Sequence, residues 1–313
     1  MNIKFTLVLV LKVIILTIVM FILFSVGASA FTADSAMAQQ MSPEDAAASG
    51  VLLLVVSFID TLILTYFILR SRLSGLCLMV VVALVFYGVK TFTSIIEAWW
   101  FMTNITPEEI PGLFLMTVPM AVLFPLVAVP ILGKAKKGER LDEPPNTRLV
   151  MPIGQLAWKV VVLSVIVYPT LFWTFGYYVA FSNPELVAFY GDTHPGSFTA
   201  QMSNIWADDP LVFVFEIFRG ALWIALAAPV IRTTKGRIWE AGLLVVLLFT
   251  LVQNDVHLLP GVMPPSVRLS HFIETASSNL IYAVILTWLV HREHGSLHDL
   301  FNFGRAEPAK IAG

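Results

Sequence analysis

Charged residues are scarce in this chain, and their scarcity limits where the chain can fold. Of the 313 residues, 13% are charged and 58% are hydrophobic, and the mean hydropathy is +0.82. A soluble domain could not bury that much apolar surface in one core, so the sequence predicts a protein whose solvent is the lipid bilayer. The formal net charge of -2 points to no acidic partner, and we expect no nucleic-acid partner.

Cysteine is almost absent, since the chain has only one, Cys77. A single thiol excludes an intramolecular disulfide and a thiolate metal cluster. Because Cys77 lies within an apolar run, we expect it to be a small residue of the core. The chain also lacks the GxxxxGK[ST], GxGxxG, HExxH and GxSxG motifs, so nucleotide hydrolysis, dinucleotide binding, zincin chemistry and α/β-hydrolase chemistry have no support. No cofactor is predicted.

Long apolar runs are abundant and recur along the whole chain. An α-helix needs about 20 apolar residues to cross roughly 30 Å of hydrocarbon. The sequence therefore predicts an all-α, polytopic transmembrane helical bundle of eight helices. The expected spans are 8–31, 50–70, 75–98, 110–133, 154–181, 210–231, 238–258 and 269–290.

Lys and Arg are missing from alternate loops, which indicates the orientation. Segments 32–49, 99–109 and 182–209 contain neither residue. The other connections and the C-terminal tail are basic: Arg70, Arg72, Lys134, Lys136, Lys137, Arg140, Arg148, Arg232, Lys235, Arg237, Arg292, Arg305 and Lys310. Because cytoplasmic loops are enriched in Lys and Arg, we expect a multi-pass protein of the bacterial cytoplasmic (inner) membrane with both termini in the cytoplasm.

The first span has a second interpretation, as a cleaved signal peptide. Lys4 precedes the apolar run, and Ala28-Ser29-Ala30 and Ala36-Met37-Ala38 are typical of cleavage sites. Cleavage would leave seven helices. The apolar run from Val13 to Ala30 is longer than a usual signal core, which favours a retained anchor.

The loop 134–153 divides the chain into two groups of four helices, 1–133 and 154–291, the second with the outer loop 182–209. A cytoplasmic tail, 292–313, follows. The halves share features typical of a 4+4 tandem repeat, because Arg70 and Arg232 end the second helix of each, and Glu97 and Asp255 end the third. Such repeats occur in transporters, where sites lie between the halves. Convergent packing of apolar helices explains the similarity equally well.

Ionisable residues within the spans are costly and usually face the bundle interior or a water-filled cavity. Asp60 and Lys90 fall near mid-membrane, where we expect them to pair. Lys90 and Glu97 are seven residues apart and face the same way, but about 10 Å of helical rise separates them. The remaining ionisable residues cluster toward the outer side and predict a polar vestibule there: Glu97, Glu216, Arg219, Asp255, His257, Arg268, His271 and Glu274. Glu216 and Arg219, at i and i+3, are expected to form an internal ion pair.

The eighth span gives the clearest local pattern. Arg268, His271, Glu274 and Ser278 are spaced so that they share one helix face. His271 and Glu274 could bind a transition metal together with His257, with Asp255 nearby. The alternative is structural: Arg268 pairs with a carboxylate, and His271 is a hydrogen-bonded residue of the core that holds one helix against another.

Several short strings resemble a group of bacterial multi-pass membrane proteins to which no activity is attached. They are Leu69-Arg70-Ser71-Arg72-Leu73-Ser74-Gly75, Thr91-Phe92 with Ile96-Glu97, Phe218-Arg219-Gly220, and His271 with Glu274 and Ser278-Asn279. The resemblance covers most of the chain. It implies an inner-membrane helical bundle and no particular substrate.

The function we expect is transport or permeation of a small solute or ion through the outward-facing polar vestibule. The first alternative is an intramembrane enzyme that works by metal or acid–base chemistry, which requires His257, His271 and Glu274 to converge. The second is a structural or sensory subunit that binds a protein partner, or a second copy of the chain, through loop 182–209. Asp192 and His194 of that loop are candidate ligands.

Overall fold

The computed structural model describes residues 3–33, 35, 42–102, 105–136, 146–191, 194, 196–260 and 263–301. Every regular element within these residues is a helix, apart from one isolated bridge between Ser71 and Thr234. Several residues used above lie outside the described residues: Ala36-Met37-Ala38, Lys137, Arg140, Asp192, Arg305 and Lys310. Residues 137–145 of loop 134–153 and residues 302–313 of the tail 292–313 also lie outside them.

Within the described residues, seven helices are long and apolar enough to cross a membrane, which confirms the all-α polytopic bundle. Four of them are α1 (Ile3–Thr32), α3 (Pro43–Arg70), α12 (Leu211–Thr233) and α14 (Pro265–Val290). The other three are composite: α4 (Gly75–Tyr87), η1 (Gly88–Phe92) and α5 (Thr93–Phe101); α6 (Ile110–Leu115) and α7 (Val118–Ile131); and α8 (Ile153–Val161), η2 (Val162–Val167), α9 (Tyr168–Phe175) and η3 (Gly176–Ala180). Three short helices lie in the connections and the tail: α10 (Pro184–Phe189), α11 (Phe198–Asp208) and α15 (Leu297–Leu300).

The segment expected to span at 238–258 forms a shorter apolar helix instead. It comprises α13 (Ile238–Leu247) and η4 (Leu248–Val252), and a separate 3₁₀ turn, η5 (Asp255–Leu258), comes after it. The Asn254 amide nitrogen donates to the carbonyl oxygens of Phe249 and Thr250, at 3.3 and 3.0 Å. The last carbonyls of a helix have no partner within it, so this side chain ends the helix before the polar residues of η5.

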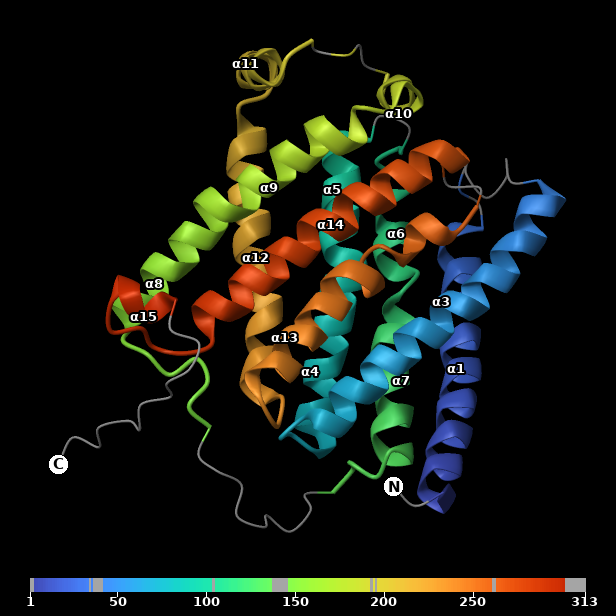
Figure 1. Ribbon diagram of the computed structural model, residues 1–313. Helices are drawn as coiled ribbons and strands as arrows, with labels where there is room; N and C mark the ends of the chain where they lie inside the picture. Colours follow the sequence, from blue (N-terminus) through green and yellow to red (C-terminus); the bar gives the residue numbers. More distant parts are fainter. Residues whose placement is uncertain are drawn as a thin grey trace.

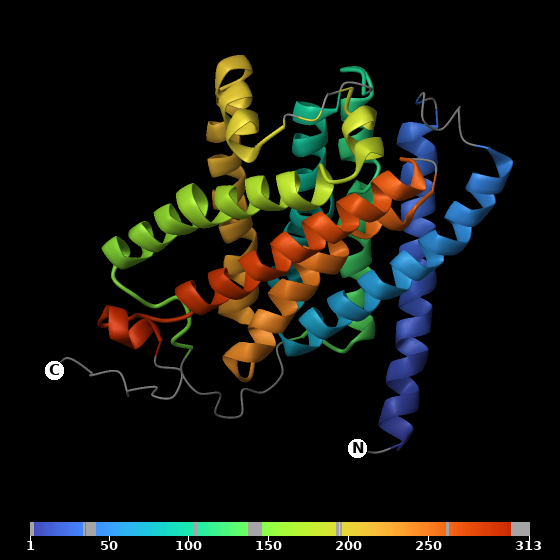
Figure 2. The same ribbon diagram turned by 45° about the horizontal axis from the view of Figure 1, so that its top comes forward.

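The helices form one bundle, with α1 and α8–α9 at opposite edges (Figures 1 and 2). The first helix packs against α3 and α7, and α7 also packs against α4. On the other side, α12 contacts η2 and α9, while α14 contacts α13, η4 and α9. The division of the chain into two repeated halves stays a prediction.

Basic loops meet at one end of the bundle, here called the basic end. The Arg72 amide donates to the Thr233 carbonyl, and Nζ of Lys134 donates to the Ser71 carbonyl at 2.7 Å. Arg148 reaches the same place and donates to the Ile231 carbonyl at 3.3 Å. These contacts place three predicted cytoplasmic connections on one side. The short helices α10 and α11 lie at the opposite end, here called the loop end (Figure 1).

Cys77 does not belong to the core as expected, because it is exposed on α4. Leu76, Val80 and Leu84 are exposed on the same helix. Lipid tails are as apolar as a protein core, so an apolar run in a membrane helix does not indicate which of its faces is turned inward.

Four of the helical segments are π-helical turns, and two of them carry or precede ionisable residues. Lys90 lies within η1, and η4 ends three residues before Asp255. The two turns pack against each other. A π turn adds one residue to the helical repeat, rotates the side chains after it, and is frequent at functional sites.

Candidate functional site

A lysine and two aspartates meet inside the bundle, and we call Lys90, Asp60 and Asp255 the lysine triad. Nζ of Lys90 lies 2.9 Å from Oδ2 of Asp60. It also lies 2.6 and 2.5 Å from Oδ1 and Oδ2 of Asp255. All three residues are buried, and they come from α3, η1 and η5. The structure therefore brings together the expected pair, Asp60 and Lys90, and adds a residue that the sequence assigned to the outer vestibule.

Aromatic rings cover the triad. Nζ of Lys90 lies 5.4 Å from the ring centroid of Phe24 on α1 and 6.0 Å from that of Phe86 on α4. Ring faces attract a cation, although more weakly than a carboxylate does. The charges of the triad are therefore held in an apolar surrounding, where removing them from water is costly and pairing them is necessary.

A second group, the arginine cluster, comprises Arg219, Glu216 and Glu97. Nη1 of Arg219 donates to both carboxylate oxygens of Glu216 at 3.0 Å, and Nη2 donates to Glu97. The structure therefore forms the expected pair on α12 and adds Glu97 from α5. The guanidinium carbon lies 5.3 Å from the Phe172 ring centroid and 5.8 Å from that of Tyr168. Aromatic faces and two carboxylates thus fix its position.

His271 of α14 connects three elements at the loop end. Its Nε2 lies 2.7 Å from the Tyr190 hydroxyl, and its Nδ1 lies 3.3 Å from Oε2 of Glu274. An ionised Glu274 can only accept, so Nδ1–H of a neutral His271 donates to it and Nε2 accepts from Tyr190. Burial, with the negative charges of Glu97 and Glu274, raises the pKa of the Tyr190 phenol, which keeps it a donor. The outer loop thus contributes Tyr190 to the site.

Arg268 contacts the main chain. Its Nη1 donates to the Leu258 carbonyl at 3.1 Å, which ties α14 to η5. The structural interpretation of the eighth span expected a carboxylate here instead. A carbonyl dipole is a weaker partner for a guanidinium than an ionised carboxylate.

The geometry of the two histidines does not favour the metal site. The imidazole rings of His257 and His271 are stacked, with centroids 5.6 Å apart and planes 21° apart. Because imidazole lone pairs lie in the ring plane, stacked rings do not direct them at one ion in the space between. Nδ1 of His257 also lies 3.1 Å from the Asn254 carbonyl. Within the described part of the chain, no group of three His, Cys, Asp or Glu residues is placed to hold a metal ion.

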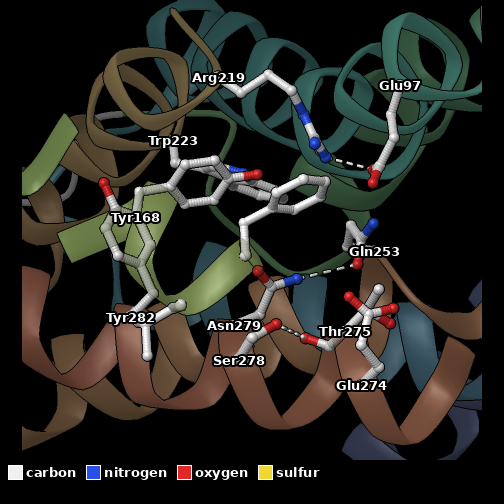
Figure 3. A pocket seen from close by; sticks show the side chains of 12 residues that line it. Glu97, Tyr168, Arg219, Trp223, Gln253, Glu274, Thr275, Ser278, Asn279 and Tyr282 are labelled. Atoms are coloured by element: carbon white, nitrogen blue, oxygen red, sulfur yellow. Dashed lines mark hydrogen bonds and ion pairs between the residues drawn. The ribbon is translucent and has the colours of Figure 1, made fainter. Parts of the chain in front are cut away.

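A small cavity of about 20 Å³, enough room for one water molecule, lies between the arginine cluster and α14. In Figure 3, Glu97 and Arg219 face Glu274 and Ser278 across it. The lining combines charged, amide, hydroxyl and aromatic side chains: Glu97, Tyr168, Leu171, Phe172, Arg219, Trp223, Gln253, Glu274, Thr275, Ser278, Asn279 and Tyr282. Buried ionisable groups that face a cavity among membrane helices are typical of an ion or substrate pathway.

Gln253 links the cavity to the main chain of Lys90. Its Oε1 accepts from the Asn279 amide at 3.1 Å, and its Nε2 donates to Oγ of Ser94 at 3.4 Å. Ser94 Oγ in turn lies 3.4 Å from the carbonyl oxygen of Lys90. The sequence did not lead us to Gln253 and Asn279 as residues of the site. Gln253 could have been identified, because it directly precedes Asn254 and Asp255 in an otherwise apolar run.

Two other polar groups lie away from the cavity: His194 of the outer loop, and the residues around Lys159 near the basic end. Nδ1 of His194 accepts from the Gly196 amide at 3.1 Å, which makes it part of a local turn. Near the basic end, Nζ of Lys159 donates to Nδ1 of His294 at 2.8 Å and to the Arg292 carbonyl at 2.9 Å. Both groups have structural partners, and neither lines the cavity.

No protein-family model, no curated protein and no solved structure matches this chain. The functional conclusion therefore depends on the physical arrangement described above.

Proposed function

We propose that this membrane protein transports a small solute or ion across the bilayer, and that the cavity of Figure 3 is its binding site. The observation that supports the proposal is a cavity lined by Glu97, Arg219 and Glu274 inside a bundle of apolar helices. Ionisable residues among membrane helices are costly, and they usually mark substrate or ion pathways.

The charge of the lining favours a cation. Three carboxylates, those of Glu97, Glu216 and Glu274, lie in or beside the cavity, whereas Arg219 is the one Arg or Lys in the lining. The aromatic residues Tyr168 and Trp223 also line the cavity, and aromatic rings attract cations to their faces. A small cation or a protonated amine would offset the excess negative charge.

The cavity also favours transport over a purely structural role. A structural subunit would have tightly paired charges and a filled interior. The charges are indeed paired, but the carboxylate of Glu274 faces the cavity and its nearest hydrogen-bond partner is a histidine at 3.3 Å. By the distribution of basic loops, we place the basic end in the cytoplasm and the cavity toward the outer side of a bacterial inner membrane.

Electrical currents from protein-containing liposomes on a solid support test the proposal. Sodium, potassium, ammonium, methylammonium and guanidinium are applied in turn, with acetate and phosphate as anions of comparison. We expect a saturable current for at least one cation, because the site must bind it before it moves. In Glu274→Gln this current should fall to the level of empty liposomes.

The matched control is Glu108→Gln, which makes the same chemical change at an exposed glutamate of the loop end. It should leave the current and its saturation unchanged. A current that is equal in Glu274→Gln and the wild type would remove the cavity from the pathway. The absence of a current for every solute, in folded and reconstituted protein, would contradict the transport proposal.

A further inference from the structure

The lysine triad has more negative than positive groups. Two aspartate side chains face one lysine ammonium, so a fully ionised triad would carry one uncompensated negative charge. Asp60 is completely buried and Asp255 is 3% exposed. Holding an uncompensated charge in such surroundings is strongly unfavourable, because the ion has been removed from water without a partner.

No other cation compensates this charge in the described part of the chain. Among the described residues, Lys90 is the one cation within ion-pair distance of Asp60 or Asp255. From α1 and α4 the triad is faced by the rings of Phe24 and Phe86.

The other titratable groups near η5 have partners elsewhere. His257 stacks on His271, and His271 contacts Tyr190 and Glu274. Arg268 donates to the carbonyl of Leu258. The missing positive charge must therefore come from outside the chain.

The two carboxyl groups are placed to share a proton. Asp60 and Asp255 contact the same ammonium, since their Oδ2 atoms lie 2.9 and 2.5 Å from Nζ of Lys90. Two ionised carboxylates cannot hydrogen-bond to each other, because neither has a donor, but a carboxylic acid and a carboxylate can. Neither oxygen of Asp60 has a donor from the described residues other than the ammonium of Lys90. A proton on the aspartate pair would satisfy one of these oxygens and neutralise the triad.

We propose that the lysine triad binds one exchangeable proton, held between Asp60 and Asp255, and that this proton is the coupling ion of the cavity site. On release, the O–H bond of the carboxylic acid breaks, the electron pair stays on the carboxylate, and the proton passes to water. Rebinding is the reverse step. The proton is not assigned to either aspartate, because it belongs to the pair.

Gln253 and Ser94 link the cavity to the main chain of Lys90. Gln253 lines the cavity and lies two residues before Asp255, while Ser94 lies one helical turn after Lys90. A change in the triad's charge is also felt at the cavity, since Gln253 and Asp255 lie two residues apart at the junction of η4 and η5. The coupling role rests on the proposed transport function, whereas the bound proton does not.

Infrared difference spectroscopy on the reconstituted protein reads the proton directly, without any transported solute. A protonated carboxylic acid has a carbonyl-stretch band that an ionised carboxylate lacks. At neutral pH we expect this band in the wild type, and we expect carboxyl-labelled aspartate to shift it, which separates it from the glutamates of the cavity. Asp60→Asn and Asp255→Asn should each lose the band. In each variant the charge of Lys90 balances that of the one remaining aspartate, which therefore stays ionised.

A variant that changes the cation gives the opposite result. In Lys90→Met the two aspartates have no positive partner, so we expect the aspartate band to grow as both become protonated. Asp208→Asn, at an exposed aspartate of α11, is the matched control and should leave the band unchanged. An aspartate band that is absent from the wild type, or that persists in both Asp→Asn variants, would overturn the proposal.

The coupling role has a separate test in the same liposomes. If the triad binds and releases its proton during each transport cycle, the cation current of the wild type should depend on the pH gradient. In Asp60→Asn the current should lose this dependence. A cation current with equal pH-gradient dependence in both proteins would refute coupling while leaving transport intact. If the Asp→Asn variants lose the infrared band but neither they nor the wild type gives a current, transport would be refuted and the proton site would stand.

Discussion

Glu216 and Arg219 lie one turn apart on α12, and both carboxylate oxygens of Glu216 accept from Nη1 of Arg219 at 3.0 Å. A second carboxylate, that of Glu97, approaches the same guanidinium from α5. Arg219 is thus the one positive group shared by two negative ones within the arginine cluster. The cluster is asymmetric, so its members should respond differently to mutation.

Replacing Arg219 should be far more damaging than replacing Glu216. Arg219→Met leaves two glutamates without their cation, and breaking a buried ion pair costs about 3–5 kcal/mol. Glu216→Gln leaves a one-to-one pair between Arg219 and Glu97 and should cost less than half as much. Unfolding of both variants in lipid bicelles measures the difference. Equal losses of stability would show that Glu97 does not take over as the partner of Arg219.

Gly220 should tolerate no side chain, because α12 packs closely on η2 at this position. A Cβ there would lie 2.8 Å from Cα of Ser164 and 3.1 Å from Cβ of Tyr168. Gly220→Ala should therefore destabilise the fold by about 1–3 kcal/mol through overpacking. Gly154→Ala is the control, since no atom lies within 4 Å of the added carbon. Equal free energies of unfolding for the two variants would contradict the close contact of α12 with η2.

Stability should fall in mild acid because of His294. Burial, with the positive charges of Lys159 and Arg292, lowers the pKa of His294 from 6.5 to about 4. Between these values the unfolded chain binds more protons at this site than the folded chain, so the free energy of unfolding decreases as the pH falls from 6.5 to about 4. In His294→Asn this dependence should be shallower over the same pH window. A parallel pH profile in the two proteins would contradict the buried, neutral histidine.

The ends of the bundle should face opposite sides of the membrane. Asp208 is exposed at the loop end, and Lys136 is exposed at the basic end. In a Cys77→Ser background, Asp208→Cys should react with an impermeant thiol reagent added outside intact cells, and Lys136→Cys should react only after the cells are broken. Reaction of both variants from the same side would contradict the predicted orientation.

The sequence predicted the bundle because hydropathy depends on composition alone, and apolar runs of spanning length are visible without knowledge of packing. It predicted the pairs Asp60 with Lys90 and Glu216 with Arg219 from membrane depth and helical spacing. It could not show that Asp255 joins Lys90 or that Glu97 joins Arg219, since both contacts connect segments far apart in the chain.

The expected common face of Lys90 and Glu97 illustrates the limit of helical spacing. Seven residues return to nearly the same face of an α-helix, so the sequence placed both side chains on one side. The π turn of η1 adds a residue between them and rotates the side chains after it by about 100°. Lys90 therefore faces the aspartates, and Glu97 faces Arg219 and the cavity. No pattern in the sequence marks a π turn.

Chemical accessibility of the cavity from the outer side tests the transport proposal most directly. In the Cys77→Ser background, Ser278→Cys places a thiol in the cavity lining, whereas Thr287→Cys places one on the same helix away from it. We expect Ser278→Cys to react from the side reached by Asp208→Cys, and faster with a cationic than with an anionic methanethiosulfonate, because carboxylates dominate the lining. Thr287→Cys should stay unreactive. A Ser278→Cys variant that reacts no faster than Thr287→Cys, or that prefers the anionic reagent, would contradict a water-filled site for cations.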